Sequence, residues 1–125
     1  MFQWYSKNDK KGVATIYPTN ITINKIASAY LQNAYACLLG IDQEEKRVAL
    51  KPLTQDQYQS GRFNPDEMFV LSGSKTYTRI SSTDFVSQIS HLLGQDFHMG
   101  NKKYECSFDE KERLLIIDFR KEVTA

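Results

Sequence analysis

The chain has 125 residues, which is the usual size of one domain. Its 16 Lys and Arg residues nearly balance 15 Asp and Glu residues, which excludes a strongly basic nucleic-acid tail and an acidic, solvating segment. No apolar run approaches the roughly 18 residues that span a bilayer, and the start, MFQWYSK, lacks the apolar core of a secretory signal. We therefore expect a single cytoplasmic domain over residues 1–125, with no membrane partner.

The N-terminal region is predicted to form a β-hairpin. Phe2–Ser6 is aromatic and strand-like, residues 8–12 are a polar turn, and Val13–Tyr17 is strand-like again. Pro18 and Asn20 then interrupt the second strand.

Residues 13–53 have the pattern of a strand, a helix and a hairpin. Ile21 and Ile23 alternate with Thr22, and Asn24 is a suitable N-cap for a helix. The apolar residues that follow at helical spacing are Ile26, Ala29, Tyr30 and Ala34. An apolar strand over residues 35–41, a charged turn and an alternating strand over residues 47–51 come next, and Pro52 is expected to end that last strand.

Residues 68–120 repeat this pattern after a polar linker, residues 54–67. A short apolar segment ends at Gly73, and a strand over residues 76–81 leads to a helix that starts near Ser81 and ends at Gly94. The apolar stripe of this helix consists of Phe85, Val86, Ile89, Leu92 and Leu93. A hairpin follows, whose second strand, Leu114–Phe119, is apolar on both faces and should be central in a sheet. The tail from Lys121 is expected to fray.

The two similar segments predict one shared core, because neither could bury its apolar face alone. The predicted fold class is α+β, with two pseudo-symmetric β-α-β-β units in a small barrel or sheet plus the N-terminal hairpin. The residues expected in the core are Phe85, Ile89, Leu93, Leu115, Ile117 and Phe119.

The segments ITINKIASAYL, LLGIDQEEKRVALKP, YTRISSTDFV and LLIIDF carry a resemblance to known proteins. Over most of residues 13–119 the chain resembles a family of small prokaryotic proteins of uncharacterised role. More distantly, each unit is similar to the strand-helix-hairpin unit of the AbrB and MraZ transcription regulators. That resemblance implies a small barrel of intertwined units that binds DNA, often as an oligomer.

Three positions depart from the regulator pattern. The Pro that usually follows the first strand of an AbrB unit is Asn24 here, and the Arg expected early in the helix is replaced by the run Ala27–Ala29. The Asp-x-x-x-Arg motif of MraZ is also absent, because Asp84 is followed at that spacing by Gln88. These departures weaken the inference of DNA binding more than that of the fold.

No catalytic or metal-binding motif occurs in the chain. His91 and His98 have no partner in the sequence pattern, and Cys37 and Cys106 are expected to be buried core thiols, with a disulfide between them disfavoured in a reducing compartment. We predict no enzyme activity, no catalytic residue, no cofactor and no metal.

The basic residues point instead to an anionic partner. Lys10 and Lys11 share the N-terminal turn, and Lys25 and Arg79 lie near the starts of the two predicted helices. Lys and Arg contacts to phosphates supply most nonspecific affinity for nucleic acid. The first hypothesis is a binding protein for duplex DNA, of the AbrB/MraZ-like regulatory kind. The alternative is a protein-interaction or self-association module with no nucleic-acid role, in which exposed strand edges pair between chains.

Overall fold

The computed structural model describes residues 1–2, 11–97 and 100–123. The strands are β1 (Val13–Ile16), β2 (Asn20–Ile23), β3 (Ala36–Asp42), β4 (Arg47–Leu53), β5 (Met68–Val70), β6 (Ser72–Ser74), β7 (Tyr77–Ser81), β8 (Lys102–Asp109) and β9 (Leu114–Glu122). The helices are α1 (Lys25–Ser28), α2 (Gln55–Gln59) and α3 (Thr83–Leu93), and the 3-10 turns include η2 (Ala29–Leu31) and η3 (Pro65–Glu67).

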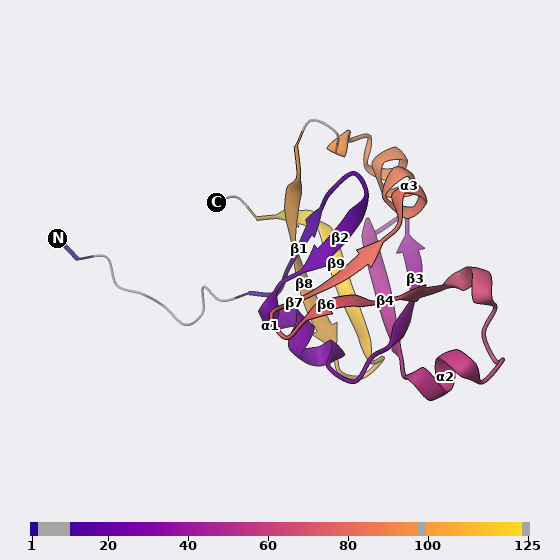
Figure 1. The fold of residues 1–125 in the computed structure, drawn as a ribbon. Helices are drawn as coiled ribbons and strands as arrows, with labels where there is room; N and C mark the ends of the chain where they lie inside the picture. Colours follow the sequence, from indigo (N-terminus) through magenta and orange to yellow (C-terminus); the bar gives the residue numbers. More distant parts are fainter. Residues whose placement is uncertain (3–10, 98–99, 124–125) are drawn as a thin grey trace.

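The strands form one sheet that curls into a nearly closed barrel (Figure 1). Their order is β5-β3-β4-β9-β8-β1-β2-β7-β6, with every neighbouring pair antiparallel. The two outermost strands, β5 and β6, are separated in the chain by Leu71 alone. The chain therefore passes directly from one edge strand to the other, and both edge strands have only three residues, which limits pairing with another chain.

Helix α3 covers one end of this barrel and α1 lies at the other (Figure 1). Ser82 accepts a hydrogen bond from the Phe85 N–H as the N-cap of α3, and Gly94 ends the helix in the left-handed conformation. The buried face of α3 consists of Phe85, Val86 and Ile89. The N-cap is thus Ser82, one residue after the predicted Ser81, and the C-cap is Gly94, as predicted.

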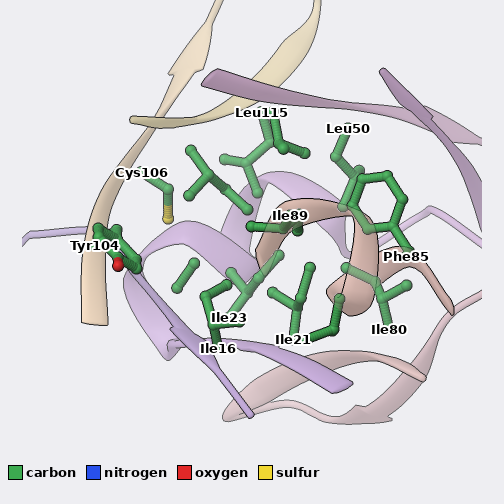
Figure 2. Packing of buried hydrophobic residues seen from close by; sticks show 14 of the residues in the cluster. Ile16, Ile21, Ile23, Leu50, Ile80, Phe85, Ile89, Tyr104, Cys106 and Leu115 are labelled. Atoms are coloured by element: carbon green, nitrogen blue, oxygen red, sulfur yellow. The ribbon is translucent and has the colours of Figure 1, made fainter. Parts of the chain in front are cut away.

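The core draws on both halves of the chain, so the protein is a single small domain of mixed α and β structure. Figure 2 shows side chains from strands all around the barrel converging on Ile89, which is fully buried. Five of the six predicted core residues are buried, and the sixth, Leu93, is half-buried against the same cluster.

The predicted apolar stripe of the first helix is wrong. Instead of one helix over this region, α1 has four residues and is followed by η2. Ala27 and Leu31 face the core, whereas Ile26 and Tyr30 are 41% and 50% exposed. A helix of one turn is too short for apolar residues at helical spacing to line up on one face. The spacing of Ile26, Ala29, Tyr30 and Ala34 therefore does not identify the residues of α1 that face the core.

Strand β1 pairs with β2 through a tight turn at Pro18, and on its other side with β8. The hairpin predicted between residues 2–6 and 13–17 falls mostly on residues outside the described part of the chain. Among the described residues, the hairpin partner of β1 is the strand that follows it.

Three predicted boundaries were also wrong. Strand β4 continues through Pro52 to Leu53. The Pro52 nitrogen, which has no hydrogen to donate, faces β9, and the ladder between β4 and β9 has already ended at Leu50, so no ladder hydrogen bond is lost. Strand β9 extends past Lys121, and the Val123 N–H donates to the Lys103 carbonyl at 2.8 Å. Gly73 lies inside β6 rather than ending the segment.

The predicted linker, residues 54–67, contains α2 and η3. Thr54 and Gln57 form a capping box at the start of α2, with two reciprocal hydrogen bonds of 2.8 and 3.2 Å. In the described part of the chain, no helix has the length and apolar character needed to cross a membrane.

Candidate nucleic-acid interface

Lys25 is held at the first position of α1 by the side chain of Asn24. The Asn24 Oδ1 accepts from the Ala27 N–H at 3.2 Å and from the Val13 N–H at 3.1 Å, and its Nδ2 donates to the Lys11 carbonyl at 2.8 Å. One side chain therefore caps α1 and ties it to the segment that leads into β1. This arrangement sets Lys11 and Lys25 beside each other at one end of the barrel.

Lys11 and Lys25 line one shallow hollow, which we call the α1 hollow, together with Ile26, Gln32 and Lys75. Lys11 also forms an ion pair of 2.8 Å with Glu105, and its side chain is 57% exposed. Two of the four cationic residues predicted from the sequence are thus together, and Lys75 is added to them.

Lys75 reaches this surface because of the register between β2 and β7. Ile23, at the end of β2, pairs with Thr78 near the start of β7. The start of α1 and the turn between β6 and β7 consequently lie at the same end of the ladder. Neither Lys25 nor Lys75 forms an ion pair with any residue in the described part of the chain.

A second hollow lies between α1, η2 and the β6–β7 turn, and we call it the β6–β7 hollow. Its volume is about 890 Å³, and Lys25, Gln32 and Lys75 line it as well as the α1 hollow. Leu31, Ala34 and Leu71 provide an apolar part of its lining, and Tyr77 with several hydroxyl groups provides the rest.

The close pairing of β6 with β7 depends on Gly73, which has a φ of 132°. A β-carbon at Gly73 would lie 2.4 Å from the Tyr77 carbonyl oxygen, closer than real β-carbons come. Ser74 and Thr76 then hold the turn with hydroxyl groups 2.9 Å apart, and the Thr76 N–H donates to Ser74 at 3.2 Å.

Of the other two predicted cations, Arg79 does not join this group. Arg79 lies on the exposed face of β7, with its guanidinium 5.1 Å from the ring centre of Tyr77, and it is not among the described residues that line either hollow. Lys10 lies outside the described residues.

Both cysteines are free and buried, in β3 and β8, as the sequence predicted. Burial raises the pKa of Cys37 and of Cys106 to about 12. At neutral pH both groups are therefore thiols, which are poor nucleophiles compared with thiolates.

His91 is exposed near the end of α3 and lines a hollow that also contains Asp96 and Gln95. His98 lies outside the described residues. Within the part of the chain that the structure describes, no three His, Cys, Asp or Glu side chains come close enough to hold a metal ion together.

In comparisons with protein-family models, with curated proteins and with solved structures, nothing matches the chain. The assignment of a function therefore depends on the surface just described.

Proposed function

We propose that the protein is a non-enzymatic, cytoplasmic nucleic-acid-binding protein whose contact surface is the α1 hollow. The proposal rests on one observation: Lys11, Lys25 and Lys75 line the same small surface. Lys25 and Lys75 form no ion pair within the described residues, so their charges are available to phosphate groups. The free, unpaired thiols support a reducing compartment.

A regulatory role of the AbrB/MraZ-like kind is part of this proposal. Its support is that each half contains a β-α-β-β stretch, β2-α1-β3-β4 and β7-α3-β8-β9, and that the strands in corresponding places pair antiparallel, β2 with β7 and β4 with β9. The resemblance to the MraZ type implies two such units in a single chain.

The nearly balanced net charge means that affinity must come from this local surface. Because Glu105 already neutralises part of the Lys11 charge, we expect weak binding with a shallow salt dependence.

The test is a fluorescence-anisotropy titration of duplex DNA at low and moderate salt. Lys25→Ala/Lys75→Ala should weaken binding at low salt and reduce the slope of log K against log salt by about two units. The charge-matched control is Lys46→Ala/Lys111→Ala, which removes two exposed lysines from hairpin turns outside both hollows. Lys10→Ala and Arg79→Ala test the remaining predicted cations. If Lys25→Ala/Lys75→Ala, the control variant and the wild type bind duplex DNA equally well, the α1 hollow is not the contact surface.

A second candidate function is that of a protein-interaction module. The observation that favours it is the exposure of large apolar side chains at positions 26, 30, 35 and 70, which are between 39% and 50% exposed. Self-association measured by sedimentation, reduced by Ile26→Ser/Tyr30→Ser and unaffected by Lys25→Ala/Lys75→Ala, would support this candidate. If the protein self-associates in this way and has no affinity for nucleic acid at low salt, the protein-interaction module replaces the nucleic-acid-binding proposal.

A further inference from the structure

We propose that the β6–β7 hollow receives one unpaired nucleotide, so that the preferred partner is single-stranded rather than duplex nucleic acid. This inference rests on the proposed nucleic-acid-binding function and specifies its partner; a preference for single strands would replace the duplex-binding regulatory role of the AbrB/MraZ-like kind. The phosphate would lie against Lys25 and Lys75, and the base would lie over the apolar lining of the hollow.

The lining has the composition that a nucleotide needs. Leu31 is 4% exposed and belongs to the core, and Ala34 and Leu71 pack against the core, so this part of the lining is apolar and continuous with the core. Ser72, Ser74 and Thr76 add hydroxyl groups that can bond to a base edge or a sugar. A hollow of about 890 Å³ also falls within the size range of sites for small organic ligands.

The cations have the position that this occupant requires. Lys25 and Lys75 line both hollows, so they stand where the two surfaces join, and Lys11 lines the α1 hollow beyond them. Consider a sugar–phosphate backbone that runs from one hollow to the other. Lys25 and Lys75 would contact the phosphate of the nucleotide whose base enters the β6–β7 hollow, and Lys11 would contact a neighbouring phosphate.

Duplex nucleic acid would leave most of this surface unused. In a duplex the bases are stacked and paired inside the helix, and a convex backbone would touch the lysines without reaching Leu31 or Leu71. An unpaired base can leave the stack and enter a concave site at little cost. The apolar lining beside the two cations is therefore a reason to prefer a single strand.

Tyr77 is the aromatic side chain of this lining and Arg79 is its neighbour. The guanidinium of Arg79 lies over the ring of Tyr77, 5.1 Å from the ring centre, which is the distance of a cation–π contact. We assign Tyr77 to contact with the base and Arg79 to positioning of Tyr77. This assignment gives Arg79 a role although it does not line the hollow.

The experiment compares a labelled 12-nucleotide oligothymidylate with a duplex of the same length, at the same two salt concentrations. We expect the wild type to bind the single strand at least roughly tenfold more tightly than the duplex. Tyr77→Ala should weaken single-strand binding roughly 5- to 100-fold, the range for loss of one base–aromatic contact, and should leave duplex binding unchanged. Tyr77→Phe is the matched control and should bind like the wild type, since the ring is kept.

Because Tyr77 is half-buried, circular dichroism must confirm that each variant is folded. If Tyr77→Ala does not fold, Tyr77→Leu retains an apolar side chain without the aromatic face and should show the same loss. Arg79→Gln should weaken single-strand binding less than Tyr77→Ala, and should have no further effect in a Tyr77→Ala background.

Two outcomes separate the failure of this inference from that of the proposed function. Equal affinity for single strand and duplex, with folded Tyr77 variants that bind like the wild type, would overturn the inference and leave nucleic-acid binding intact. If the wild type binds neither probe at low salt, the proposed function fails and the inference fails with it.

Discussion

Lys46 and Arg113 occupy the same left-handed backbone position in two different hairpin turns, with φ values of 53° and 59°. Each follows a turn that begins with an aspartate. Asp42 Oδ1 accepts from the Glu45 N–H at 3.1 Å, and Asp109 Oδ1 accepts from the Glu112 N–H at 3.1 Å. The β3–β4 and β8–β9 turns therefore share one geometry, in which an Asp closes the turn and a long cationic residue reverses the chain.

We predict that the left-handed position will tolerate glycine and reject a β-branched residue. Lys46→Gly should be more stable than Lys46→Val by about 1–2 kcal/mol, because valine disfavours positive φ and glycine does not. The measurement is the free energy of unfolding from urea denaturation. Lys46 suits this test better than Arg113, whose guanidinium also contacts Phe108 and Glu110. Equal stability of the two variants would mean that the turn rearranges at no cost.

The central position of Ile89 predicts a large loss of stability on truncation. Ile89→Ala should lower the free energy of unfolding by about 2–5 kcal/mol, because a fully buried side chain at the centre of the barrel leaves a cavity. Ile26→Ala, at a 41% exposed position, is the control and should cost less than about 1 kcal/mol. A loss below 1 kcal/mol at Ile89 would contradict the packing shown in Figure 2.

Asn24 is expected to be important for stability because its side chain makes three hydrogen bonds. Asn24→Ala should cost about 1–3 kcal/mol, since it removes the cap of α1 and leaves backbone groups of Val13 and Lys11 without that partner. Asn24→Asp keeps the acceptor for the Ala27 and Val13 N–H groups, so it should cost less. Denaturation of both variants is the measurement, and equal losses would show that the bond to the Lys11 carbonyl dominates.

The buried thiols predict a loss of stability at high pH. Each cysteine has a folded pKa of about 12, above the ordinary value of 9.0, because burial disfavours the thiolate. A pKa raised by folding contributes stability that is fully present below pH 9 and is lost as the pH rises from 9 toward 12. The free energy of unfolding should therefore fall more steeply above pH 9 in the wild type than in Cys37→Ala/Cys106→Ala.

A thiol-labelling experiment checks the same burial independently. At pH 8 the native protein should react with a thiol reagent far more slowly than the unfolded chain. Rapid labelling of two thiols in the folded protein would show that β3 and β8 open easily.

The amino-acid sequence by itself determined the features that arise from local chemistry. The apolar stripe of α3, its left-handed Gly94 and the apolar character of β9 follow from sequence patterns that are local to a helix or a strand. The burial of Cys37, Cys106, Leu115 and Ile117 follows from the same patterns.

Only the tertiary structure decided which strands lie side by side. The pairing of β1 with β8, the continuation of β4 through Pro52 and the exposure of Ile26 and Tyr30 depend on neighbours that are distant in the chain. Sequence patterns pointed to Lys11 and Lys25 but left Lys75 out of the predicted site, because that lysine reaches Lys25 only through the register of β2 with β7. Local propensities set the buried face of α3, whereas the buried face of α1, the strand order and, with that order, the candidate site come from contacts between residues far apart in the chain.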